Sequence, residues 1–176
     1  MKVYYVDEPK CHDSYLCLIK HLVTSCDYFS LVYFSHDPDE PMSTTTSHIA
    51  NQLQCYEVAS FFSNSWPLTT TLNQNNHIYR VIIYRCDKNV VPILAKQPGI
   101  YAWDYPDAPM DLCFYKNRLC MFASSAHEKD AYLFTDDSTF VDLIHNAGID
   151  VFYHRETDQN KVFSFDSFHQ SITHSK

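Results

Sequence analysis

Apolar positions along the chain recur with two different spacings, which predict short strands and a few helices. A short strand is expected at 2–6. Apolar residues at helical spacing after the cap-forming residues 12–14 then predict a helix of about 14 residues. The stretch 27–35 is aromatic and β-branched on both faces, as in a strand from the middle of a sheet.

The next part of the chain predicts a loop, a long helix and a hairpin. Prolines and acidic residues make 36–46 a loop, and a helix capped by Thr46 or Ser47 is expected to follow and to end near Asn64. Two strands, 68–72 and 77–85, flank an amide-rich NQNN turn and are expected to pair. A short helix is expected over 87–96.

The best-defined pattern is a second hairpin, formed by 112–115 and 118–123 with a turn at Lys116 and Asn117. Both faces of these segments are apolar, so we expect the hairpin to lie between two layers of the fold. In the simplest register Cys113 lies opposite Cys120.

After this hairpin the pattern predicts a strand at 131–134, a helix from 138 to about Ala147 that is closed by Gly148, and a strand at 149–154. The remaining residues are polar apart from three phenylalanines, and we expect them to pack loosely or to serve as an edge. Strands grouped in hairpins indicate an α+β fold with a mostly antiparallel mixed sheet and helices packed on its faces. We expect a single domain over 1–155, with 156–176 as a tail or edge segment.

Composition excludes several classes of function. The formal net charge is −8, whereas proteins that grip a nucleic-acid backbone need clustered Lys and Arg. Only two glycines are present, too few for a glycine-rich phosphate loop. The chain is 45% hydrophobic, which is enough for a substantial core in 176 residues.

Seven cysteines, an odd number, predict reduced and mostly buried thiols in a cytosolic protein. The first residues lack the apolar centre of a signal peptide, and no run approaches the length of a membrane span. We therefore expect a cytoplasmic protein, in a bacterial host cell, that does not contact a membrane.

Two polar segments are candidates for function. The loop residues Trp103, Asp104, Tyr105 and Asp107 suit a protein interface, because large rigid rings give contact area at low entropy cost, but they equally suit a loop pinned onto its own core. The heptad 124–130 contains His127 and Glu128, which could contact a ligand or partner, transfer a proton, or form only a polar turn.

Metal and nucleophile chemistry are weakly supported. Cys113, Cys120 and His127 are regularly spaced, but two thiols across a flat hairpin lack the knuckle that structural zinc requires. The cysteines lie in apolar strings, which disfavours a reactive thiolate. We expect no metal, no cofactor and no catalytic residue, although an enzyme is not excluded by the residues alone.

The candidate segments also carry a resemblance. It rests on Trp103, Pro109-Met110-Asp111-Leu112 followed by Phe114-Tyr115, Ser125-Ala126-His127-Glu128 followed by Ala131-Tyr132, and the strand from Cys26 to Val32. In this order the chain resembles small bacterial and phage-borne proteins commonly labelled stage III sporulation protein AH. The resemblance extends over 15–145, with a turn at Lys116 and Asn117 where the group has glycine, and it implies an intracellular protein of unknown biochemical role.

Two functions remain open beside a third possibility, a structural subunit of a larger assembly, which would show as a large exposed apolar patch. The first is a small protein-binding module, an inhibitor or antagonist in phage–host or toxin–antitoxin conflict, that contacts its partner through the candidate loop residues with His127 and Glu128. The second is a sensor of a small molecule or nucleotide, or an enzyme acting on one, with His127 in a pocket walled by Tyr115, Tyr132 and Trp103. A concavity around His127 would favour the second.

Overall fold

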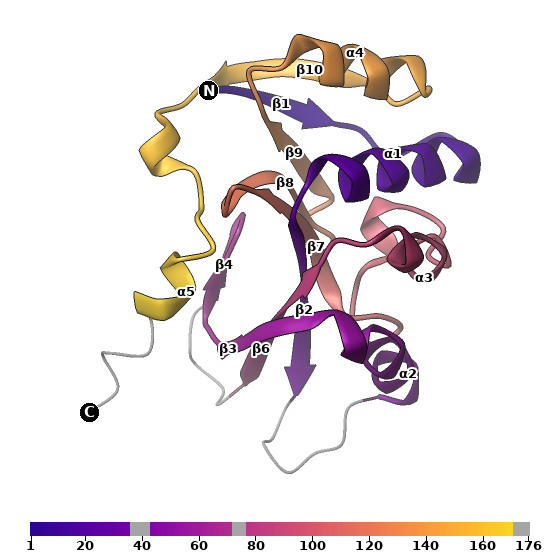
Figure 1. Ribbon diagram of the computed structural model, residues 1–176, viewed down its shortest axis with the longest axis vertical. Helices are drawn as coiled ribbons and strands as arrows, with labels where there is room; N and C mark the ends of the chain where they lie inside the picture. The colour runs from indigo at the N-terminus through magenta and orange to yellow at the C-terminus, as the bar shows by residue number, and fades with distance from the viewer. Residues whose placement is uncertain (36–42, 72–76, 171–176) are drawn as a thin grey trace.

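The computed structural model describes residues 1–35, 43–71 and 77–170 and has the expected α+β fold (Figure 1). One sheet has the strand order β10-β1-β9-β8-β7-β2-β6-β3, and every neighbouring pair in it is antiparallel. Its strands are β1 (Lys2–Val6), β2 (Tyr28–Ser35), β3 (Glu57–Phe62), β6 (Ile78–Arg85), β7 (Met110–Lys116), β8 (Leu119–Ser125), β9 (Asp130–Phe134) and β10 (Val151–Glu156). The described residues contain no helix with the length and apolar character of a membrane span.

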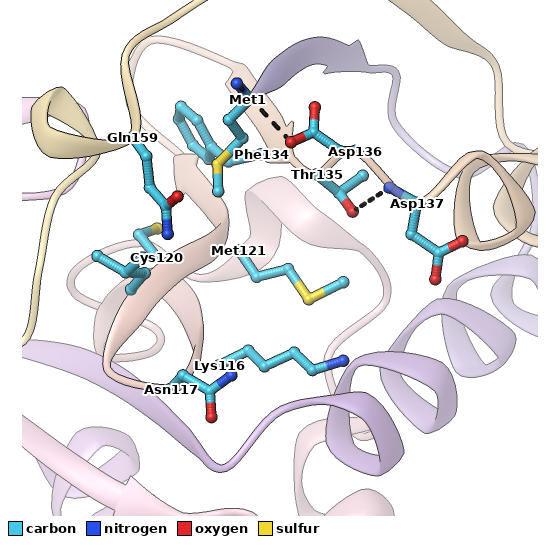
Figure 2. Close-up of a pocket in the computed structure, with 11 residues that line it drawn as sticks. Met1, Lys116, Asn117, Cys120, Met121, Phe134, Thr135, Asp136, Asp137 and Gln159 are labelled. Carbon is cyan, nitrogen blue, oxygen red and sulfur yellow. Dashed lines mark hydrogen bonds and ion pairs between the residues drawn. The ribbon is translucent and has the colours of Figure 1, made fainter.

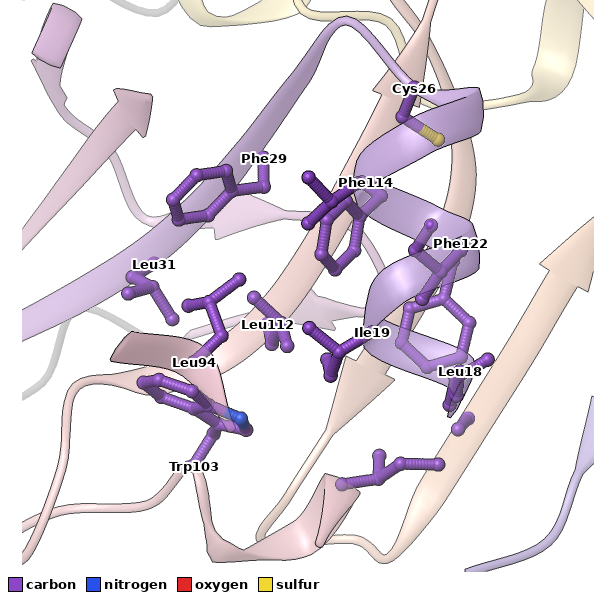
Figure 3. Close-up of a cluster of buried hydrophobic side chains, with 14 of the residues drawn as sticks. Leu18, Ile19, Cys26, Phe29, Leu31, Leu94, Trp103, Leu112, Phe114 and Phe122 are labelled. Carbon is purple, nitrogen blue, oxygen red and sulfur yellow. The ribbon is translucent and has the colours of Figure 1, made fainter. Parts of the chain in front are cut away.

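Helices cover one face of this sheet. They are α1 (His12–Ser25), α2 (Thr44–Leu53), α3 (Val91–Leu94) and α4 (Ser138–Asn146). Leu18 and Ile19 of α1 project toward Phe114 and Phe122 of the central hairpin, and all four side chains are buried in one cluster (Figure 3). The expected hairpin between two layers is therefore confirmed on this side.

The second face is covered by the C-terminal segment and by a small hairpin. That hairpin is β4 (Ser65–Trp66) with β5 (Thr69–Thr70), and it lies on the same side as α5 (Ser167–Gln170) in Figure 1. Val162, Phe165 and Phe168 are buried against the sheet in a second core cluster.

The expectation that the C-terminal segment packs loosely is wrong. The Phe168 ring stacks on Phe61 of β3 with ring centroids 5.4 Å apart. Arg118 forms an ion pair with Asp166 and lies over the Phe165 ring at 4.4 Å from its centroid. Because these contacts join the segment to β3 and to the turn between β7 and β8, the second layer is part of the domain and not an appendage.

The second helix differs from its expected course. Its N-cap is Ser43, whose hydroxyl accepts the Thr46 N–H, and the helix ends at Leu53 where a short 3-10 turn leads into β3. The apolar spacing continues at helical period into residues that form the edge strand β3. Pairing of β3 with β6 therefore outweighs the local helical pattern in this segment.

The expected pairing of 68–72 with 77–85 is also wrong. Thr69 and Thr70 pair with β4, whereas β6 pairs with β2 and β3. The predicted turn between them and the predicted loop 36–46 lie largely outside the described residues.

The central hairpin has a different register from the simplest one. Its turn is at Asn117 and Arg118, which both have positive φ, and a register shift follows Phe114. Tyr115 consequently lies opposite Cys120, and Cys113 lies opposite Ala123. The predicted Cys113–Cys120 pairing is therefore incorrect.

Both edges of the sheet are irregular. Val58 has no partner in the β3–β6 ladder, and His154 has none in the β1–β10 ladder, as in β-bulges. Edge strands also hold the most exposed large apolar side chains, with Phe62 69%, Phe152 54% and Tyr153 59% exposed. Bulges twist an edge away from further pairing, so extension of this sheet by another strand is disfavoured despite these side chains.

The seven cysteines are all free thiols. Cys26, Cys113 and Cys120 are buried and the other four are partly or fully exposed, so the expectation of mostly buried thiols is only partly met. Burial raises the pKa of Cys26 to about 12 and raises those of Cys113 and Cys120 further, which keeps these sulfurs protonated and unreactive.

Candidate functional site: an acidic hollow around Asp111

Trp103 is not at the surface. Its indole is fully buried in the same core cluster as Leu94 of α3 (Figure 3). Its Nε1–H donates to the Tyr15 hydroxyl at 2.8 Å, which in turn donates to the Leu94 carbonyl at 3.2 Å. The prediction that Trp103 contacts a partner is therefore wrong. A ring this large stabilises the core when its one polar atom has a partner, and Tyr15 supplies that partner.

The other residues of the predicted loop lie in different surroundings. Tyr105 is 36% exposed and packs edge-on against Phe34, with ring centroids 4.9 Å apart. Asp107 is exposed. Asp104, by contrast, lines a hollow together with His127 and Glu128. The structure thus brings together three of the six predicted site residues.

This hollow, which we call the Asp111 hollow, has a volume of about 290 Å³. It lies where the β4–β5 hairpin meets the start of β7 and the turn after β8. Its lining is acidic, hydroxylic and aromatic, and none of the described residues that form it is Lys or Arg. The lining residues are Trp66, Leu68, Thr69, Thr70, Thr71, Tyr79, Asp104, Met110, Asp111, Ser125, His127 and Glu128.

Asp111 is the central residue of the hollow. It is buried at the start of β7 and accepts three hydrogen bonds, from Trp66 Nε1–H at 2.7 Å, from the Thr69 hydroxyl at 3.3 Å and from the Ala126 N–H at 2.9 Å. The carboxylate therefore ties the small hairpin, the central strand and the turn after β8 to one point.

Burial raises the pKa of the Asp111 carboxyl above its usual value, because desolvation disfavours the charged form. The three donors oppose this and favour the carboxylate, while the nearby Asp104 adds to the increase. An added positive charge in the hollow would relieve the desolvated carboxylate.

Strained backbone is concentrated around the same place. Asp111 has φ 55°, Leu68 has φ 66° and Lys129, beside Glu128, has φ 55°. A left-handed conformation is unfavourable for leucine and lysine and less so for aspartate. Such strain often accumulates where a protein positions groups for function.

Sequence reasoning missed Asp111, Trp66 and Tyr79 as members of one site. The hollow is assembled from segments far apart in the chain, so spacing does not reveal it. One signal was present: Asp111 is an acidic residue next to an entirely apolar strand. A carboxylate in that position needs partners, and those partners define the site.

A second hollow adjoins the first and shares Leu68, Ser125 and Glu128 with it. We call it the Tyr132 hollow; its volume is about 270 Å³. It lies on the part of the second face formed by β1, β9 and β10, and its other lining residues are Val3, Asp130, Tyr132, Phe134, His154 and Arg155. The Tyr132 and His154 rings are 5.6 Å apart.

A third hollow, lined by residues that include Met1, Asp136 and Asp137, is shown in Figure 2, and its charged groups serve the fold. Its volume is about 190 Å³, and its acidic residues are already engaged. The Asp136 carboxylate pairs with the amino group of Met1, and the Asp137 carboxylate caps α4 by accepting the N–H groups of Thr139 and Phe140. These contacts stabilise the fold and leave less charge for a ligand.

The Asp111 hollow presents carboxylate, hydroxyl and imidazole groups to a ligand. Within the described part of the chain, no group of three or more His, Cys, Asp or Glu is arranged to hold a metal ion. His127 and Glu128 are both exposed on the turn. Tyr115, expected as a pocket wall, is buried on the sheet's second face and lines neither hollow.

Comparison of the chain with protein-family models, with curated proteins and with solved structures finds no match. The resemblance to the group labelled stage III sporulation protein AH consequently stays a prediction.

Proposed function

We propose that this protein is a protein-binding module that takes a cationic side chain of its partner into the Asp111 hollow. The observation that carries the proposal is the charge of the lining: Asp104, Asp111 and Glu128 contribute carboxylates, and none of the described residues that line this hollow is Lys or Arg. A partner's arginine or lysine would supply the missing positive charge.

Arginine fits this lining better than lysine. Its planar guanidinium can bind carboxylates through paired N–H groups and can also stack on aromatic faces. Trp66 and Tyr79 lie together at the hollow with ring centroids 5.1 Å apart. At a separation of about 4 Å and an effective dielectric constant of about 20, one such charge pair gains about 4 kcal/mol before desolvation.

The net negative charge of the protein also favours a partner whose surface is basic. A formal net charge of −8 speeds encounter with a basic surface and disfavours acidic partners. We propose that a module of this kind acts in the cytoplasm of a bacterial host as an antagonist in phage–host or toxin–antitoxin conflict, inhibiting its target by covering a basic functional surface.

Binding can be tested without knowledge of the partner by titrating ¹⁵N-labelled protein with N-acetyl-arginine amide. The two tryptophans give two indole N–H resonances, and we expect that of Trp66 to shift because it donates to Asp111. The resonance of Trp103 should stay in place, since it donates to Tyr15 and lines neither hollow. N-acetyl-alanine amide is the matched ligand control.

Substitution of the rim should weaken this response. Glu128→Gln removes one rim charge and is expected to reduce affinity about three- to tenfold, the effect of about 0.7–1.4 kcal/mol. Asp142→Asn, an exposed acid of α4, is the control and should bind as the native protein does. Equal shifts with both ligands, or equal affinity in both variants, would contradict the proposal.

A second candidate, a small-molecule sensor or enzyme, is favoured by one observation. The two adjoining hollows, about 290 and 270 Å³, together reach the size of small-ligand pockets. The acidic lining disfavours a nucleotide phosphate and suits an amine-bearing metabolite. Tighter binding of free cationic metabolites such as agmatine than of arginine-containing peptides would favour this candidate.

A further inference from the structure

The Tyr132 hollow differs from the Asp111 hollow in the charge of its walls. Val3, Tyr132 and Phe134 give it an apolar floor on the sheet. Glu128 and Asp130 lie on its rim, but so do His154 and Arg155. Because both signs of charge are present, the rim does not select a ligand of either charge. The apolar floor favours burial of an apolar side chain.

Ring geometry indicates which apolar group fits. Tyr132 has two aromatic neighbours, Tyr5 at 5.7 Å and His154 at 5.6 Å between centroids. The Tyr5 and Tyr132 rings are inclined at 75°, the edge-to-face arrangement that aromatic pairs favour. A further ring placed on this floor would extend the same row of contacts.

The two hollows are close enough for one segment. They share a wall of Leu68, Ser125 and Glu128, and Leu68, on the turn of the β4–β5 hairpin, is 43% exposed. Alternate side chains of an extended strand point the same way and are about 6.6–6.8 Å apart. Side chains at positions i and i+2 of a partner can therefore lie on either side of such a wall.

We infer that the two hollows form one bipartite site for an extended segment of a partner protein, with an arginine in the Asp111 hollow and an aromatic side chain two residues away in the Tyr132 hollow. This inference rests on the proposed function, because the arginine subsite anchors the segment. The aromatic subsite adds selectivity that the acidic hollow alone lacks.

Two blocked peptides test the inference, acetyl-Gly-Arg-Gly-Phe-Gly-amide and the same peptide with alanine in place of phenylalanine. Both should shift the Trp66 indole resonance, and only the phenylalanine peptide should shift the backbone amides of Tyr132 and His154. The phenylalanine peptide should bind about tenfold more tightly, as expected for partial burial of one ring.

Variants separate the two subsites. His154→Ala should reduce the gain from phenylalanine to less than about threefold without changing affinity for the alanine peptide. Phe62→Ala removes a ring that is 69% exposed on the other edge strand and should keep the full gain. Equal affinity of the two peptides would overturn the bipartite site and leave the proposed function standing. Failure of both peptides to bind would overturn both.

Discussion

Asp111→Ala is expected to lower the free energy of unfolding by about 3–5 kcal/mol. The substitution leaves three donors without their acceptor, Trp66 Nε1–H, the Thr69 hydroxyl and the Ala126 N–H. Each buried donor without a partner costs about 1–3 kcal/mol. Denaturant unfolding followed by circular dichroism measures the change.

Two further substitutions separate the causes of this loss. Asp111→Gly removes the same acceptor but suits the observed φ of 55°, so it should be less destabilising than alanine by about 1 kcal/mol. Asp107→Ala changes an exposed acid of the preceding loop and should stay within about 0.5 kcal/mol of the native protein. If Asp111→Ala behaved like Asp107→Ala, the three hydrogen bonds would not stabilise this region as described.

Phe168→Ala is expected to cost about 3–5 kcal/mol, the usual range for removing a buried aromatic side chain. The ring is fully buried and stacks on Phe61 at an interplanar angle of 9°. Its loss would also loosen the cover over β3 and β6. Chemical denaturation at several protein concentrations would measure the effect and exclude association as its origin.

Phe62→Ala is the matched control for Phe168→Ala. Phe62 is the neighbour of Phe61 on β3 and is 69% exposed, so its removal should change stability by less than about 0.5 kcal/mol. Equal effects of the two substitutions would mean that the C-terminal segment is held as weakly as the sequence suggested.

Local patterns predicted most elements because their signals are local. The helix α1 and the strand β2 follow from apolar spacing, and α4 follows from its Asp137 cap and the positive φ at Gly148. The cap expected at 12–14 was wrong, because α1 begins at His12 after Cys11 and has no side-chain cap. The prediction of a helix that runs to Asn64 was wrong, because a long-range contact determines the structure of its second half. Its apolar spacing continued into β3, and only pairing with β6 decides that these residues form a strand.

The candidate site was half predictable. His127 and Glu128 stood out because a polar turn between apolar strands must lie at the surface, and Asp104 followed from its loop. Trp103 was predicted to be exposed because the sequence does not show which side chains of a loop are buried. Its indole is held in the core by a hydrogen bond to Tyr15, which is 88 positions away in the chain. The spacing of Val162, Phe165 and Phe168 was visible as an i, i+3, i+6 series, but polar neighbours concealed its importance.

We propose that Asp111 is a desolvated carboxylate that accepts the positive charge of a partner. Carboxyl ¹³C NMR titration of Asp111, without and with saturating N-acetyl-arginine amide, tests this directly. In the free protein the pKa should lie above its usual value, because burial disfavours the charge. Bound arginine favours the carboxylate, so the pKa should fall, and affinity should weaken as pH drops through it. An Asp111 pKa that is identical with and without arginine would contradict the claim.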